Sequence, residues 1–437
     1  MAKKGRRKLL YIVLDGLSDG PYGLKELGGK TPLEAAFTPN MDRLARMGQT
    51  GLMHPVGKGI APESDVAVIS ILGYDAFRYY TGRGPLESFA SGLEIRPGDL
   101  ALRVNFATRG KGREILDRRV GRNLSTNEAH LLCKEINSQL QLESVPNTFE
   151  LKNTIGHRAV LVIHPKKSKL SGEITNTDPA YAREGVLGVA KEEGSYENLV
   201  QYCKPLERQK DIKGASMAAL LVNEFVLKSC ELLEASPVNT ARRKRGFLPA
   251  NLLLLRDAGD RLPAFPSIKK KFGKSFACLA DMPVERGIAL LTGMRVVELP
   301  PPTANFKRDY TLRVKKSLWA LGKFDGLYVH IKGPDVPGHD GDGLGKKAVI
   351  EAIDRFYLAP LLNQINLDTT LISLTADHST PCQLKSHSSD PVPLVICGGS
   401  VQPDGTKTFS EKACRGGSLG EMKGTQLMPL LIRYSVA

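Results

Sequence analysis

Carboxylate and imidazole side chains follow the ends of several apolar runs in this 437-residue chain. Any one of them alone would usually be a turn residue or a helix cap, so the prediction rests on their shared placement. Carboxylates and imidazoles together suit Zn²⁺ or Mn²⁺ better than Ca²⁺, and a pair of metal ions can stabilise both oxygens in phosphoryl transfer. The residues that predict a two-metal site are Asp15, Asp335, His339, Asp377, His378 and His387.

Ser64, in the loop 59–65, is the candidate nucleophile. Most loop serines are inert, and a serine hydroxyl attacks poorly unless it is activated. Here coordination to a metal ion would lower the hydroxyl pKa, so that no separate His–Asp relay is needed. Ser64 is also predicted to be the N-cap of a helix that runs to about Leu72, and the free N–H groups there would favour a phosphate.

The ligand candidates follow short, continuously apolar runs that we predict to be buried strands of one sheet. The carboxyl ends of parallel strands gather ligands at one edge of a sheet. A predicted helix over 344–362, between two of the strands, indicates a right-handed parallel crossover. A further helix is predicted from about Pro39 to Met47, with Thr38 as its N-cap. The predicted strands are Leu9–Leu14, Leu327–Ile331, Leu371–Leu374 and Pro393–Ile396.

The middle of the chain is more basic, and its predicted helices and strands do not end in acidic residues. We therefore expect a discontinuous core domain, 1–110 plus 283–437, and an inserted substrate-binding or lid domain, 111–282. The hinges are expected at 105–112 and 299–303. The expected fold class is α/β, a mostly parallel sheet flanked by helices, with a smaller α+β domain inserted.

The net charge and the cysteine usage limit which classes of binding partner we expect. The net charge of +15 suggests nucleic acid, an acidic membrane or small anions, or simply a solvated surface. The basic residues are spread along the chain without a nucleic-acid-binding motif, and no run is long enough to span a membrane. The 7 scattered cysteines, without a CxxC pair, indicate a reducing compartment. We expect a cytoplasmic protein with a small anionic phosphorylated substrate, no nucleic-acid or membrane partner, and a monomer or small homo-oligomer.

Longer motifs carry a family resemblance. The segment 38–45 (TPNMDRLA) resembles the TPN-x-D-x-L-A segment of the alkaline phosphatase superfamily, and 11–16 and 375–381 resemble its metal-binding strands. Other motifs are similar to those of archaeal-type 2,3-bisphosphoglycerate-independent phosphoglycerate mutases. In the two ends of the chain they are 82–87, 97–99, 103–108, 332–335, 338–342 and 385–393, and in the insertion they are 117–122, 156–158 and 249–256.

The resemblance implies an alkaline-phosphatase-like fold and a role for each motif residue. Two divalent ions (Mn²⁺, Mg²⁺, Co²⁺ or Zn²⁺) would be bound, and no 2,3-bisphosphoglycerate would be needed. Ser64 would become phosphoserine while 2-phosphoglycerate and 3-phosphoglycerate interconvert in glycolysis and gluconeogenesis. The ligands of one ion would be Asp15, Ser64, Asp377 and His378, and those of the other Asp335, His339 and His387.

Substrate binding calls for cationic side chains, since arginine forks match carboxylate and phosphate. Each arginine could instead be a solvent-facing charge. The chain departs from the family pattern at 176–179 (NTDP) and at 282–287, which leaves the details of glycerate binding open. The candidates are Arg118, Arg119, Arg122, His157, Arg158, Asp178, Arg256, Arg286 and Lys332.

Three alternatives stay open at this stage. The same metals and serine would serve a metal-dependent phosphomonoesterase or another phosphomutase of the superfamily. A non-catalytic anion-binding protein would bind no metal. A nucleic-acid-binding protein would show strongly salt-dependent association with DNA or RNA.

Overall fold

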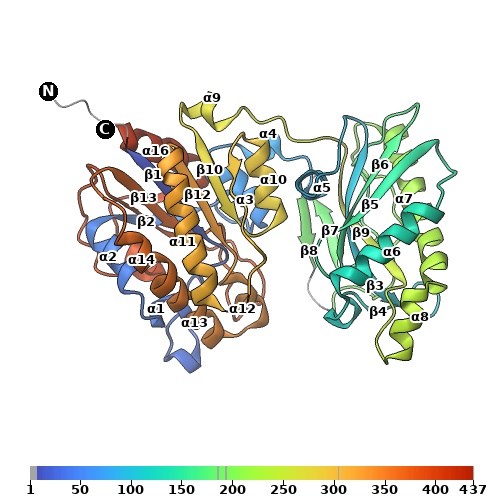
Figure 1. Cartoon of the computed structure of the whole chain (residues 1–437), viewed down its shortest axis with the longest axis horizontal. Helices are drawn as coiled ribbons and strands as arrows, with labels where there is room; N and C mark the ends of the chain where they lie inside the picture. Colours follow the sequence, from blue (N-terminus) through green and yellow to red (C-terminus); the bar gives the residue numbers. More distant parts are fainter. Residues whose placement is uncertain (1–6, 185–186, 192–193, 304, 437) are drawn as a thin grey trace. The chain divides into compact units, whose positions relative to one another are not determined.

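The computed structural model describes residues 7–184, 187–191, 194–303 and 305–436. The chain forms two compact units, the first made of Met1–Tyr79 with Ala264–Ala437 and the second of Tyr80–Pro263 (Figure 1). No helix within the described residues combines the length and the apolar character that crossing a bilayer requires.

The first unit is built on an eight-stranded sheet with strand order β11-β10-β12-β1-β13-β14-β2-β15. Its centre is parallel, because β1 pairs in parallel with both β12 and β13. The strand β14, predicted to be one of the parallel set, runs antiparallel to both β13 and β2. The bounds are β1 Lys8–Leu14, β2 Gly48–His54, β10 Phe276–Ala280, β11 Arg295–Val296, β12 Gly326–Ile331, β13 Thr370–Thr375, β14 Val392–Cys397 and β15 Gly420–Lys423.

Helices pack against this sheet in two groups, one of α3, α10 and α16 and the other of α2, α11, α13 and η3. They bury the central strands, so every residue of β12 and β13 is buried. The helix predicted over 344–362 is continuous but contains a π-helical segment, η3. The bounds are η1 Lys25–Leu27, α1 Pro32–Ala35, α2 Pro39–Met47, α3 Ser64–Ile71, α4 Ala76–Tyr79, α9 Ile268–Phe272, α10 Pro283–Leu291, α11 Phe306–Lys323, α12 Asp335–Asp340, α13 Gly343–Ile353, η3 Asp354–Leu358, α14 Ala359–Leu362, α15 Glu411–Cys414 and α16 Gly424–Val436.

The second unit has an antiparallel five-stranded sheet, in which β3 pairs with β4, β6 and β9, and β6 pairs with β5. Alternate residues of β3 face opposite sides, so Leu102 and Phe106 join the main core, whereas Ala101 joins a smaller cluster. Figure 1 shows α6, α7 and α8 beside one another. The bounds are α5 Arg83–Ala90, β3 Leu100–Arg109, β4 Ile115–Asp117, η2 Val120–Arg122, α6 Thr126–Gln139, β5 Asn147–Asn153, β6 Arg158–Pro165, β7 Tyr181–Glu184, β8 Leu187–Ala190, α7 Ile212–Glu234, α8 Pro237–Lys244 and β9 Leu252–Gly259.

The two units begin and end elsewhere than the sequence suggested. The chain passes between them at 79/80 and at 263/264, not near residues 110 and 282. The reason is strand pairing: β3, expected in the core, is the central strand of the second unit's sheet, and β10, expected in the insertion, belongs to the eight-stranded sheet. Asn105, placed in the first expected hinge, is a paired residue of β3.

Candidate active site

Three loops at the carboxyl-terminal edge of β1, β12 and β13 carry the acidic and histidine side chains. Asp15 directly follows β1, Asp377 follows β13, and Asp335 opens α12 after β12. The loops approach so closely that a Cβ on Gly16 would lie 2.6 Å from Thr380 Oγ1. Gly16 also has a φ of 62°, so glycine is required here for two reasons.

The first cluster consists of Asp15, Asp377 and His378, all fully buried or nearly so. His378 Nε2 lies 3.2 Å from Asp15 Oδ1 and 3.3 Å from Asp377 Oδ2. The Ser64 hydroxyl lies 3.2 Å from the same nitrogen. Ser64 is the first residue of α3, so the predicted cap is one residue off: the N-cap is Glu63. The structure thus brings Ser64 to the first cluster.

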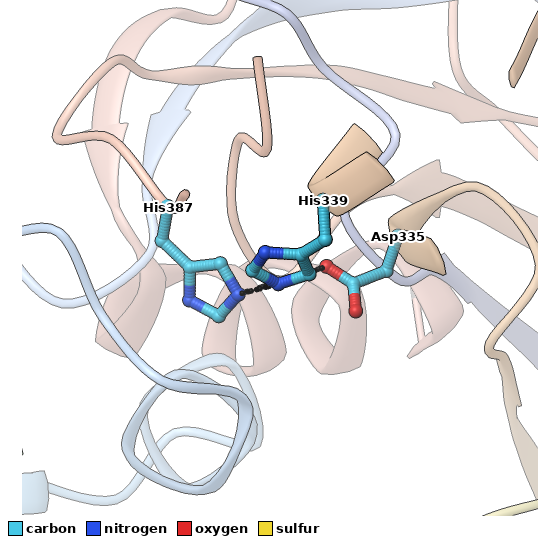
Figure 2. A group of neighbouring side chains, drawn as sticks. All are labelled: Asp335, His339 and His387. Carbon is cyan, nitrogen blue, oxygen red and sulfur yellow. Dashed lines mark hydrogen bonds and ion pairs between the residues drawn. The ribbon is translucent and has the colours of Figure 1, made fainter. Parts of the chain in front are cut away.

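The second cluster consists of Asp335, His339 and His387 (Figure 2). The Nε2 atoms of the two histidines lie 3.2 Å apart, and they are 3.4 Å and 3.6 Å from Asp335 Oδ1. Each ring is held from its other side, since Nδ1 of His339 lies 3.1 Å from the Lys385 carbonyl and Nδ1 of His387 lies 2.8 Å from that of Pro62. The Nε2 atoms and the carboxylate therefore converge.

Both clusters fit a divalent metal ion. Within the described residues, Asp15 Oδ1 and Asp377 Oδ2 are buried and accept no hydrogen bond, whereas Asp15 Oδ2 pairs with the Lys332 ammonium at 2.8 Å. Buried carboxylate oxygens without partners are unfavourable unless a cation satisfies them. In the second cluster the histidines use Nδ1 for backbone carbonyls, which is how metal-binding histidines are commonly oriented. The donors are nitrogen and carboxylate oxygen, the set that suits Zn²⁺ or Mn²⁺.

Charges around the clusters keep two carboxylates ionised. Burial alone would favour the neutral form of Asp15, but the Lys332 ammonium, 2.8 Å away, outweighs it and holds the Asp15 pKa well below its usual range. The pKa of Asp335 is also well below the usual range. Burial would raise it, but the neighbouring histidines, His339 first, and the Lys332 ammonium lower it by more. Asp377 has a raised pKa because it is buried and lies beside Asp15.

His330 is a buried residue of this site that the sequence did not single out. Its Nε2 lies 3.5 Å from Asp15 Oδ2 and 3.7 Å from Asp377 Oδ2, and its Nδ1 is 2.9 Å from the Tyr328 hydroxyl. Burial would lower the pKa of His330, but Asp15 and Glu285 outweigh it and raise the pKa to about 9. The available signal was a histidine near the end of an apolar strand, on the same face as a tyrosine two residues earlier.

In the second unit, a carboxylate joins two of the predicted arginines. Arg118 donates to both oxygens of the buried Asp178, at 2.7 Å and 2.5 Å from Nη2. Arg118 and Arg256 both face the Tyr181 ring, with their guanidinium carbons 5.4 Å and 3.7 Å from its centroid. These four residues form one continuous group.

His157 lies within the electrostatic influence of Arg256 and of three further arginines. Burial lowers its pKa to about 4, and the positive charges of Arg158, Arg119, Arg256 and Arg122 act in the same direction. An imidazole that feels four guanidinium groups lies in a concentrated positive field. By direct contacts and by their effect on the His157 pKa, the predicted substrate residues of the second unit form one basic cluster: Arg118, Arg119, Arg122, His157, Arg158, Asp178 and Arg256.

The two remaining candidates belong to the first unit. Lys332 lies between the metal-ligand clusters, since its Nζ is 2.8 Å from Asp15 Oδ2 and 2.5 Å from Asp335 Oδ2. Arg286, in α10, instead donates to both carboxylate oxygens of Glu298, each at 2.7 Å. Lys332 thus lies at the candidate metal centre, whereas Arg286 forms an ion pair with Glu298.

Comparison with known proteins decides the family. The family model described as 2,3-bisphosphoglycerate-independent phosphoglycerate mutase matches residues 45–239. A protein of that name from Aeropyrum pernix is 43% identical, over 95% of this chain and 96% of its own. One from Thermococcus kodakarensis is 40% identical, over 98% and 97%. The chain belongs to this family.

Solved structures agree with this assignment. The PH0037 protein from Pyrococcus horikoshii has a TM-score of 0.78 at 32% identity, with 98% of this chain and 97% of that chain covered. A cofactor-independent phosphoglycerate mutase from Thermoplasma acidophilum has a TM-score of 0.63 at 33% identity, with 98% and 100% covered. The predicted family and the α/β fold with a mostly parallel sheet are therefore confirmed. The family is one of isomerases.

Proposed function

We propose that this chain interconverts 2-phosphoglycerate and 3-phosphoglycerate without 2,3-bisphosphoglycerate, and that Ser64 carries the phosphoryl group in between. The observation that carries the proposal is the position of Ser64. Its hydroxyl lies 3.2 Å from His378 Nε2, beside the buried Asp15 and Asp377. As the first residue of α3, it also lies among the free N–H groups of a helix start, which favour an incoming phosphate.

Two ions would be held by the two clusters in this proposal. When bound, they would lower the pKa of the serine hydroxyl and neutralise charge on the phosphoryl oxygens. Mn²⁺, Mg²⁺, Co²⁺ and Zn²⁺ are the candidates. The proposed ligands are Asp15, Ser64, Asp377 and His378 for one ion, and Asp335, His339 and His387 for the other.

The proposed reaction has two transfers. In the first, the Ser64 hydroxyl loses its proton and Oγ bonds to phosphorus as the bond from phosphorus to the glycerate oxygen breaks, and that oxygen takes up a proton to become a hydroxyl. In the second transfer the other glycerate hydroxyl loses its proton and attacks the phosphoserine, which frees Ser64. The Lys332 ammonium, already within 2.8 Å of Asp15 and Asp335, would neutralise the migrating phosphoryl group.

The second unit would bind the glycerate. Its basic cluster supplies Arg118, Arg119, Arg122, Arg158 and Arg256, whose forks suit carboxylate and phosphate oxygens. With a pKa of about 4, His157 would be neutral at pH 7, so it could orient a hydroxyl without adding charge.

Two further roles remain part of the proposal. Arg286 would have to leave Glu298 to meet the substrate. The second unit would also exclude water as a lid, because water in the site would convert the mutase into a phosphatase.

We place the protein in the cytoplasm, as a monomer or small homo-oligomer.

A metal-replete assay with 3-phosphoglycerate and no 2,3-bisphosphoglycerate tests the proposal, with 2-phosphoglycerate and free phosphate measured together. We expect 2-phosphoglycerate with little free phosphate, and phosphate on the Ser64 peptide after an acid quench. Ser64→Ala should abolish turnover, whereas Ser400→Ala, at an exposed serine, should not. Free phosphate as the main product would instead favour a metal-dependent phosphomonoesterase, which the same serine and clusters could support.

A further inference from the structure

Thr380 contacts one candidate ligand from each of the two clusters. It lies in the loop after β13, two residues beyond His378, and is fully buried. Its Oγ1 lies 3.0 Å from His378 Nδ1, in the first cluster, and 2.9 Å from Asp335 Oδ1, in the second. One hydroxyl group therefore contacts both clusters, as the Lys332 ammonium also does.

The direction of both hydrogen bonds follows from the chemistry of the three groups. The ionised Asp335 can only accept, so the Thr380 hydroxyl must donate its single proton to that carboxylate. Toward His378 the hydroxyl can then only accept, so His378 Nδ1 carries the proton. A neutral imidazole protonated at Nδ1 has its lone pair on Nε2. That is the atom that faces Ser64, Asp15 and Asp377.

The backbone of Thr380 is fixed independently of these contacts. Its N–H donates to the Ser18 carbonyl at 2.9 Å, and its carbonyl accepts from Lys346 Nζ, also at 2.9 Å. On the remaining side Gly16 leaves no room, since a Cβ there would lie 2.6 Å from Oγ1. The hydroxyl is thus held between His378 and Asp335 by the protein itself.

We propose that Thr380 is a positioning residue that couples the two clusters, because its hydroxyl fixes the Nδ1–H tautomer of His378 and the orientation of the Asp335 carboxylate at once. This inference rests on the proposed two-metal site. It assigns Thr380 no contact with the substrate.

Two substitutions separate the hydroxyl from the shape of the side chain. Thr380→Val keeps the shape and removes the hydroxyl, whereas Thr380→Ser keeps the hydroxyl. Calorimetric titration of Mn²⁺ into the metal-stripped full chain should show about 10- to 100-fold weaker binding for Thr380→Val, the usual effect of losing a group that orients a metal ligand. The Mn²⁺ affinity of Thr380→Ser should stay within about threefold of that of the unsubstituted chain.

The tautomer of His378 gives a second readout that needs neither metal nor activity. In the metal-free protein, ¹⁵N spectra of His378 should show the Nδ1–H form in the unsubstituted chain and in Thr380→Ser, and a mixture of tautomers in Thr380→Val. Should Thr380→Val fail to fold, Thr380→Ala against Thr380→Ser makes the same comparison. Unchanged Mn²⁺ affinity and tautomer in the hydroxyl-free variant would overturn this inference alone. An unsubstituted chain that binds no Mn²⁺ would overturn the proposed function and this inference with it.

Discussion

The imidazole rings of His378 and His387 are stacked, with their centroids 3.7 Å apart and an angle of 22° between the planes. His378 belongs to the first candidate metal-ligand cluster and His387 to the second, so the two clusters are in direct contact through these stacked rings. A ring removed from either side leaves space into which the other can move. We therefore expect the two clusters to depend on each other structurally.

His387→Ala should remove one ion and weaken the binding of the other. It deletes a proposed ligand of the second cluster and also the ring that stacks on His378. Metal analysis after dialysis should find about one equivalent where the unsubstituted chain retains two, if each cluster holds a single ion as proposed. His164→Ala is the control, since His164 pairs with Asp99 in the second unit. Two retained equivalents in His387→Ala would contradict the ligand assignment.

Asp178→Asn should raise KM about tenfold while kcat stays within about threefold, because one charge-assisted hydrogen bond is worth about 1.5–3 kcal/mol. Asp178 is fully buried and bonded to Arg118, so its loss should disorder an arginine that we propose binds the substrate. The control is Glu94→Gln, which breaks an exposed fork of the same kind with Arg96. A fall in kcat at constant KM would show instead that Asp178 takes part in proton transfer.

The sequence pattern pointed to the candidate metal centre because Asp15, Asp335 and Asp377 come soon after the apolar strands β1, β12 and β13. The pattern needed only the strands β1, β12 and β13 and the rule that parallel strands end at one edge. The helix α2 was also predicted with its observed bounds, from Thr38-Pro39 at one end and Gly48 at the other. The bounds of α2 depend on neighbouring residues alone, and the candidate ligands needed in addition only the general rule for parallel strands.

The unit boundaries, the direction of β14 and the role of Thr380 could not be predicted in this way. Whether β3 pairs with β6 and β9 is decided by residues far apart in the chain. Thr380 lies in the recognised motif 375–381, but its proposed positioning role depends on a hydrogen bond to Asp335, which comes from another loop. His330 likewise belongs to the site only because it lies close to Asp15 and Asp377, which are in the loops after β1 and β13.

Lys346→Met should destabilise the first unit strongly. Lys346 is fully buried and forms an ion pair with the equally buried Asp19, and it also donates to the carbonyls of Thr380 and Ser18. Removing one partner leaves a buried charge uncompensated, which costs about 3–5 kcal/mol. Urea denaturation should show this loss, followed through the environment of Tyr11 or Tyr328 in the sheet.

The neighbouring lysine provides the control for that experiment. Lys347 is partly exposed and pairs with Glu351 one helical turn away. Lys347→Met should lower the free energy of unfolding by no more than about 0.5 kcal/mol. Equal effects of the two substitutions would show that helix propensity in α13, and not the buried ion pair, determines the result.

Glu411→Gln should stabilise the protein at alkaline pH and have little effect near pH 4.5. Glu411 is buried, and burial, with the nearby charge of Asp19, raises its pKa from 4.5 to about 7. As pH rises from 4.5 to about 7, the unfolded chain releases this proton while the folded chain retains it. Stability therefore falls across that window, by up to about 3 kcal/mol, and the loss is complete above pH 7.

The amide imitates the protonated carboxyl and does not titrate, so the difference between the two proteins should grow with pH. Glu411 accepts hydrogen bonds from the Asp19 N–H and the Thr31 hydroxyl, and the amide oxygen can keep one of them. Urea midpoints at pH 4.5, 6 and 8 measure the effect. Glu421→Gln is the control of opposite sign: the exposed Glu421 has a pKa lowered by Lys58 and His54, so its charged form is the favourable one above pH 4.5. If Glu411→Gln changed stability equally at all three pH values, the pKa of Glu411 would be the same in the folded and unfolded chains, and its two hydrogen bonds would have to balance its burial.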